Sequence, residues 1–343
     1  MNINPSDLKA CYKLIKDGSH SFYAASKLLP KNVRDPAIVL YAFCRIADDT
    51  VDLGFGGDDP ISSLRERLKL AYLGTPKNLP TDRAFAEMVK SCQMPRELPE
   101  ALLEGLEWDA AGLSFASLSE LHSYSARVAS AVGVMMCVLM GVRDKDVLAR
   151  ACDLGAAMQL TNIARDIGED ARNGRLYIPL EWMAEEGIKP SEFLKNPKPG
   201  PKIAKLAKRL LSEAENLYNR AEAGLSALPL SCRPGIFAAR HIYEQIGRHI
   251  ASKNYDSISD RAFTTKLEKV GFLALSVANT ATVTLMPTSA IVHAAPLKEM
   301  EFLISAAAKT QETKPYLIRK TETVLSILEQ MERKDRGLQG VLE

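Results

Sequence analysis

Residues 159–170 read QLTNIARDIGED, with polar and apolar side chains that alternate at helical spacing. At helical spacing its polar side chains share one face, and its leucine and isoleucines share the other. The stretch therefore predicts a helix with one polar stripe along an otherwise apolar surface. The stripe consists of Gln159, Asn162, Asp166 and Asp170.

A second acidic cluster, DDTVD at residues 48–52, comes far earlier in the chain. Asp48 and Asp52 are one helical turn apart, and their face continues backwards through Arg45 and Tyr41. Aspartates this close repel one another on a helix, and the dipole at a helix C-terminus disfavours them further. A divalent cation would offset that cost.

Magnesium is the metal that these residue types favour. Mg²⁺ prefers oxygen ligands and is usually held by one or two carboxylates together with substrate phosphates. Two carboxylate stripes on facing helices would bind a diphosphate through Mg²⁺, which would neutralise the leaving group. One such acidic pair is usually a solvated helix face, but two pairs, each beside arginines, favour a site. The arginines that would face phosphate oxygens are Arg45, Arg165, Arg172 and Arg175.

Helical spacing recurs along the rest of the chain, and Pro- and Gly-rich segments separate the expected helices. The sequence thus predicts an all-α protein. We expect one large helical domain over residues 1–297 and a charged helical C-terminal extension over residues 298–343. The expected helices are 5–17, 35–53, 61–74, 83–93, 97–106, 118–140, 144–170, 203–227, 233–253 and 263–286.

The composition excludes some classes of protein. The 343 residues are 46% hydrophobic and 25% charged, which fits a soluble globular protein with a sizeable core. A net charge of +2 gives no argument for a nucleic-acid partner, and we expect none. The six cysteines are scattered without a CxxC pair, and no secretory signal precedes them, so we expect a cytoplasmic location and free thiols.

One uncharged stretch, residues 270–297, complicates this interpretation. It contains no Lys, Arg, Asp or Glu, and its length would suffice for a membrane span. Several serines and threonines and Pro287 interrupt it. We expect a buried core helix that ends near Met286, and peripheral contact with the inner face of a membrane is the alternative.

Several motifs in the first three quarters of the chain resemble the signatures of the squalene and phytoene synthase family. The resemblance covers about residues 15–270 and implies the all-α isoprenoid synthase fold with a central active-site cavity. Ser125 stands where the family usually has Cys, and Ser130 where it usually has Gly, but neither replaces an expected metal ligand. The motifs are SHSFY (19–23), LLP (28–30), YAFCRIADDTVD (41–52), YSARVASAVG (124–133), QLTNIARDIGED (159–170) and NGRLYIP (173–179).

The resemblance implies an enzyme that condenses two prenyl diphosphates head to head. One substrate ionises to an allylic cation, a double bond of the other attacks it, and the resulting cyclopropyl diphosphate ionises and rearranges. Two geranylgeranyl diphosphates giving phytoene, a step of carotenoid biosynthesis, is the expected reaction. The alternative is a C30 product, squalene or dehydrosqualene, from farnesyl diphosphate. We expect a need for Mg²⁺, with Mn²⁺ as the alternative metal, no need for NADPH, and downstream carotenoid enzymes as partners.

The same resemblance implies roles for individual residues. A structural hydrogen bond is the alternative role for the tyrosines, and core packing is the alternative for Phe22. The expected metal ligands are Asp48, Asp52, Asn162, Asp166 and Asp170, with Glu169 assisting. The expected catalytic residues are these four aspartates with Tyr41, Tyr177 and Tyr243. The expected substrate-binding residues are Ser19, Ser21, Phe22, Tyr41, Arg45, Gln159, Asn162, Arg165 and Arg175.

Ser26 bears on the length of the substrate. It lies one helical turn beyond Phe22 and is small. If that face lines the substrate tunnel, Ser26 leaves room for a C20 chain. Two other classes stay open: a head-to-tail or cyclising terpenoid enzyme, which would share the metal clusters, and a non-catalytic helical binding protein.

Overall fold

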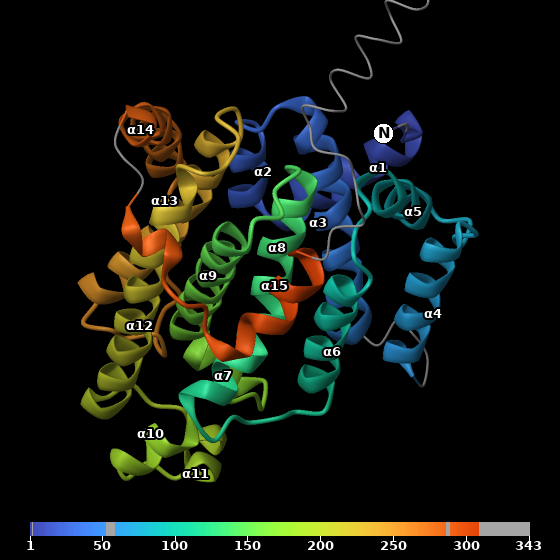
Figure 1. The fold of residues 1–343 in the computed structure, drawn as a ribbon. Coiled ribbons are helices and arrows are strands. Elements are labelled where there is room, and N and C mark those ends of the chain that lie inside the picture. Colours follow the sequence, from blue (N-terminus) through green and yellow to red (C-terminus); the bar gives the residue numbers. More distant parts are fainter. Residues whose placement is uncertain (2, 53–58, 286–288, 309–343) are drawn as a thin grey trace, which may run out of the picture. The chain divides into compact units, whose positions relative to one another are not determined.

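A computed structural model describes residues 1, 3–52, 59–285 and 289–308, and every regular element in these ranges is helical (Figure 1). The all-α prediction is therefore confirmed. Residues 309–343, most of the expected extension, lie outside the described residues. The α-helices are α1 (Pro5–Gly18), α2 (His20–Ser26), α3 (Lys31–Asp52), α4 (Pro60–Leu73), α5 (Pro80–Cys92), α6 (Glu97–Ala110), α7 (Leu118–Ser125), α8 (Ala131–Leu139), α9 (Lys145–Arg172), α10 (Leu180–Glu185), α11 (Pro190–Lys195), α12 (Pro201–Leu225), α13 (Arg233–Ser252), α14 (Lys266–Leu285) and α15 (Glu301–Ala308). The shorter elements are the π-helix η1 (Ala126–Ser130) and the 3₁₀-helices η2 (Ala290–His293) and η3 (Lys298–Met300).

Helix α9 organises the packing. It contacts α12 and α13 on one side and η1, α8 and α15 on the other, as Figure 1 shows. Its apolar residues Leu160, Ile163 and Ile167 are buried, as their spacing predicts. The Asp144 side chain caps its N-terminus by accepting from two backbone N–H groups. Beyond its C-terminus Gly174 has φ 74°, a left-handed conformation that glycine adopts without strain.

The helix expected over residues 118–140 is three consecutive elements: α7, the π-turn η1 and α8. The Ser130 hydroxyl at the end of η1 is buried and donates to the Cys152 carbonyl of α9, at 2.8 Å. A Cβ atom on Gly155 of α9 would lie 2.6 Å from the Ser130 Cα, so the two backbones are in direct contact there. Ser130, one of the two departures from the family motif, thus helps to join η1 to α9.

The compact unit runs from Met1 to Ala308, beyond the expected boundary at 297. Met300, Leu303 and Ala307 are fully buried, and α15 packs against α6, α8 and α9. The first residues of the expected extension therefore belong to the core of the helical domain.

The structure corrects the prediction that α14 is a buried core helix. Its buried residues are Ser276 and Thr280, whereas Leu267 and Leu285 are 83% and 88% exposed. Glu268, Asn279 and Thr284 contact side chains of α13, and many apolar residues of the helix are exposed. Among the described residues, every helix is too short or too polar to span a bilayer.

Two glycine substitutions test how tightly α9 is packed. Gly168 donates its N–H to the Ser257 carbonyl, and a Cβ atom there would lie 2.7 Å from the Ile258 Cα. We expect Gly168→Ala to lower the free energy of unfolding by about 1–3 kcal/mol, because backbone must move to admit the methyl group. A Cβ atom added to Gly271 on α14 would meet no atom within 4 Å, so Gly271→Ala should raise this free energy by about 0.5–1 kcal/mol. Chemical denaturation measures both, and effects of the same sign would contradict the close contact at Gly168.

Candidate functional site

A cavity of about 350 Å³ lies between α2, α3, η1, α8, α9, α12 and α13. Most of its wall is apolar, which suits a hydrocarbon ligand. Along α9 the lining runs from Val147 to Asn162, a distance of about 22 Å at 1.5 Å per residue. Asp166 and Asp170 follow one and two turns beyond Asn162 on the same face of α9. The polar side chains that line the cavity are Ser26, Tyr41, Arg150, Gln159, Asn162 and Tyr243.

Two arginines hold the Asp166 carboxylate. Arg165 Nε donates to Oδ1 at 2.8 Å, and Arg261 donates to both oxygens at 2.7 and 3.1 Å. Arg261 also lies 3.4 Å from Glu169. Arg261 follows α13 outside every motif that marked the site, so no signal in the sequence indicated it. The Asp166 side chain is 15% exposed and that of Glu169 is 50% exposed, which places Asp166 deeper in the site.

Asp170 carries a strongly perturbed carboxyl group. Burial, and then the negative charges of Asp166 and Glu169, raise its pKa to about 7, although Arg175 and Arg165 oppose the shift. Burial at this end of α9 thus disfavours a negative charge on Asp170 unless a cation compensates it. A site of this kind favours the binding of a cation.

Because the pKa of Asp170 is raised, replacing this carboxyl with a neutral amide should stabilise the protein, and the gain should depend on pH. Between the ordinary value of 3.8 and about 7, the folded protein keeps a proton on Asp170 that the unfolded chain has released. The folded state therefore loses stability as the pH rises through this window. We expect Asp170→Asn to melt about 3 °C or more above the wild type at pH 8 in EDTA, with a smaller gap at pH 5. Thermal melts at both pH values measure this, and an equal gap at both would contradict it.

The first acidic cluster is held by Arg45 at the end of α3. Arg45 donates to Asp49 at 3.0 Å through Nε and pairs with it at 2.7 Å through Nη2, while Asp48 lies 3.6 Å from Nη1. Asp49, which lies off the expected stripe, is therefore the closer partner of Arg45. Asp52 ends α3, and its side chain lies outside the described residues.

Three aromatic side chains meet at the cavity. The Phe22 ring lies 5.4 Å from that of Tyr243 and 6.3 Å from that of Tyr41, and all three residues line the wall. Burial raises the pKa of Tyr243 to about 12 and raises the pKa of Tyr41, so both phenols stay neutral at ordinary pH. Ser19 caps α2 by accepting from the Phe22 N–H, and neither Ser19 nor Ser21 lines the cavity. Phe22, Tyr41, Gln159 and Asn162, four of the residues expected to bind substrate, thus line one cavity.

Tyr177 lies elsewhere. Its hydroxyl donates to Asp109 at 2.8 Å, and Tyr124 donates to the other oxygen of the same carboxylate at 2.9 Å. The two tyrosine rings stack with centroids 5.3 Å apart, and Tyr177 is not among the residues that line the cavity. The structure thus places Tyr177 in a structural hydrogen bond, the alternative that the sequence left open.

The residues of the polar stripe fit a metal that is shared with substrate. Asn162 Oδ1 is buried and has no hydrogen-bond partner, a state that costs about 1–3 kcal/mol unless a ligand satisfies the oxygen. In the part of the chain that the structure describes, no three His, Cys, Asp or Glu side chains converge into a metal cluster. A buried amide oxygen beside carboxylates suits Mg²⁺ that takes its other ligands from water and phosphate.

Comparisons with known proteins agree with one another. A family model described as squalene/phytoene synthase matches residues 15–268. A phytoene synthase of Cereibacter sphaeroides is 53% identical over 346 residues, covering 98% of this chain and 96% of the relative. A phytoene synthase of Rhodobacter capsulatus is 51% identical, covering 98% of this chain and 99% of the relative. A solved dehydrosqualene synthase in complex with a ligand superposes with a TM-score of 0.74 at 30% identity, covering 81% of this chain and 97% of that one.

Proposed function

The chain belongs to the squalene/phytoene synthase family, and we propose that it joins two molecules of geranylgeranyl diphosphate head to head to give phytoene. It is a prenyltransferase of the 15-cis-phytoene synthase type, acting in carotenoid biosynthesis. Relatives that carry the phytoene synthase name match it over nearly its whole length, which favours the C40 over the C30 reaction. One structural observation carries the proposal: an apolar cavity follows α9 and leads to the polar stripe.

Side chains at the cavity would bind the prenyl tails, bind the diphosphates and stabilise the carbocation. The apolar wall binds the prenyl tails and excludes water, which would otherwise capture an allylic cation. Arg45, Arg165 and Arg261 would bind phosphate oxygens once substrate competes for them. The faces of Phe22, Tyr41 and Tyr243 border the cavity and favour positive charge on the reacting carbons.

We propose that the polar stripes hold Mg²⁺, with Mn²⁺ as the alternative, and that no NADPH is used. The bound metal supplies positive charge that neutralises the diphosphate leaving group. Glu169 would assist from the rim of the stripe, where Arg261 now holds it. The proposed ligands are Asp48, Asp52, Asn162, Asp166 and Asp170.

The apolar product requires an apolar destination outside the protein. Phytoene has lost both diphosphates, and a hydrocarbon of this size is driven out of water. We therefore propose that the protein works in peripheral contact with a membrane and passes its product to enzymes that act later on the same hydrocarbon.

The experiment is to incubate the protein with geranylgeranyl diphosphate and Mg²⁺ in detergent, without NADPH, and to analyse the extracted lipid by mass. We expect a C40 hydrocarbon that is absent when EDTA removes the metal. A C30 product from farnesyl diphosphate, with none from the C20 substrate, would overturn the assignment of substrate. No hydrocarbon from either substrate would overturn the enzymatic proposal and favour a non-catalytic binding protein.

A further inference from the structure

The outward face of α14 is a continuous apolar stripe. Leu267 and Leu285 are exposed at its two ends, and Val270 and Val277 are exposed between them. No charged residue occurs from 270 to 285, and the 20-residue helix is about 30 Å long. An exposed apolar surface of this length marks an interaction site. Small exposed residues complete the stripe: Gly271, Ala274, Ala278 and Ala281.

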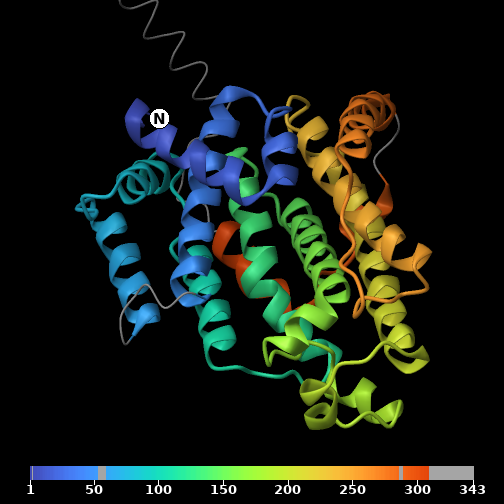
Figure 2. The ribbon, with the colours of Figure 1, turned by 180° about the vertical axis from the view of Figure 1, so that it is seen from behind.

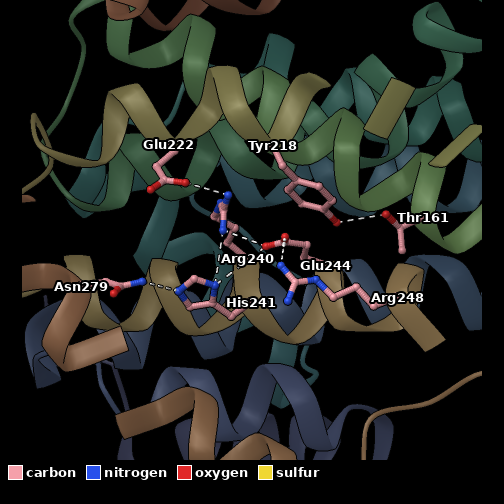
Figure 3. A network of polar contacts seen from close by, with 8 residues as sticks. All are labelled: Thr161, Tyr218, Glu222, Arg240, His241, Glu244, Arg248 and Asn279. Carbon is pink, nitrogen blue, oxygen red and sulfur yellow. Dashed lines mark hydrogen bonds and ion pairs between the residues drawn. The ribbon is translucent and has the colours of Figure 1, made fainter. Parts of the chain in front are cut away.

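Polar contacts fix this orientation. Asn279 on α14 lies 2.9 Å from His241 on α13, and Arg233 donates to Thr284 at 2.8 Å. Figure 3 shows that His241 in turn lies against Arg240, which bridges Glu222 of α12 and Glu244 of α13. Rotating α14 to bury its apolar stripe would break these contacts. The helix therefore holds polar groups towards the protein and apolar groups away from it, the arrangement expected at a lipid surface.

The stripe is adjacent to the wall of the cavity. Helix α14 contacts both α13 and α2, and these three helices lie side by side in both views (Figures 1 and 2). Phe22 and Ser26 on α2 line the cavity, as do Ile236 and Tyr243 on α13. A hydrocarbon that leaves between these helices would meet the apolar stripe directly.

The charge around the stripe indicates which lipids it would meet. Lys266 is exposed at the start of α14, and Arg248 is exposed on α13. Basic side chains beside an apolar helix face attract anionic lipid headgroups.

From these observations we infer that the outer face of α14 inserts into the interfacial layer of a bilayer that contains anionic lipids, and that product leaves the cavity beside it. The inference rests on the proposed function, because a hydrocarbon product requires an apolar destination. The proposed partner of this face is the lipid bilayer, and the experiment below distinguishes it from a second copy of the chain.

The test uses the full chain in flotation with vesicles of phosphatidylcholine and phosphatidylglycerol. The double variant Ala274→Glu and Ala278→Glu places two charges on the exposed stripe without altering the polar face. Its matched control is Ser212→Glu and Asn216→Glu, which adds the same charges at the same spacing on exposed positions of α12. We expect the α14 variant to lose about tenfold or more in vesicle binding, and the control to bind like the wild type. Vesicles of phosphatidylcholine alone should bind the wild type more weakly.

Several outcomes would overturn the inference. These are a wild type that does not float, an α14 variant that floats like the wild type, or equal binding to both vesicle types. A dimer that the α14 variant converts to monomers, with vesicle binding unchanged, would show that a second copy covers the stripe. Both variants should keep wild-type activity in detergent. A further outcome is that the wild type and both variants all fail to make phytoene in detergent while vesicle binding still depends on α14. In that case the proposed function is wrong and the lipid-binding surface is supported.

Discussion

Asp166→Asn is expected to lower the kcat/KM for phytoene formation by about 10²–10³-fold. The carboxylate lies one turn beyond the unpartnered Asn162 oxygen and is held by Arg165 and Arg261. The amide keeps the size of the side chain but removes the charge that would bind a divalent cation. A steady-state assay at saturating Mg²⁺ measures the loss, and the Mg²⁺ concentration for half-maximal activity should rise.

The matched control is Glu169→Gln on the same helix. It removes the same charge from a side chain that is 50% exposed, where ion pairs contribute little, so we expect activity within about tenfold of the wild type. Thermal melts establish that both variants fold, because Asp166→Asn weakens two ion pairs. A folded Asp166→Asn protein that is as active as the control would contradict the metal assignment.

Ser26→Phe is expected to shift the preference from the C20 towards the C15 substrate by about 100-fold in the ratio of kcat/KM values. Ser26 is buried and lines the cavity, and its hydroxyl donates to the Tyr23 carbonyl at 2.8 Å. Helices α2 and α13 are already close, since a Cβ atom on Gly235 would lie 3.3 Å from the Ala25 carbonyl oxygen. The added ring therefore projects into the cavity and shortens it.

Competition between geranylgeranyl and farnesyl diphosphate, with C40 and C30 hydrocarbons separated by mass, measures this shift. Ser26→Ala is the control, because it removes the hydroxyl and adds no volume, and it should keep the C20 preference. An unchanged C40 product from Ser26→Phe would show that this face does not limit the length of the chain.

Local periodicity predicted the polar stripe because residues four apart on one helix share a face wherever that helix packs. Gln159 and Asn162 line the cavity as expected, and Asp166 and Asp170 continue their stripe. The same reasoning placed Tyr41 and Arg45 beside the first acidic cluster. These predictions needed no knowledge of tertiary structure.

Contacts between distant segments were beyond that reasoning. Arg261 is 95 residues from Asp166 in the sequence, and the two meet because the segment after α13 packs against α9. Tyr177 and Asp109, 68 residues apart, meet in the same way, so the proximity of Tyr177 to a motif did not place it at the cavity. Nothing local marks either pair.

The prediction for α14 was wrong for a different reason. The absence of charge indicated burial, but it does not indicate which face of a helix turns inwards. Ser276, Asn279 and Thr280 recur at helical spacing, and this polar pattern was the available signal. Asn279 contacts His241 of α13, and the Ser276 and Thr280 hydroxyls donate to carbonyls of α14 itself, so this polar face can pack against the protein.

The π-turn η1 has a consequence for how this chain tolerates deletions. A π-turn accommodates one residue more than an α-turn without changing the phase of the helix that follows. Loss of one residue within 126–130 would convert the turn to α-helix and leave α8 facing the cavity. Loss of one residue within α9 would instead rotate the rest of the helix by about 100°. A deletion before Asn162 would turn it away from the face of the preceding residues, and a deletion after it would turn Asp166 and Asp170 away from Asn162. We therefore expect α9 not to tolerate a one-residue deletion, whereas the run of α7, η1 and α8 should tolerate one within η1.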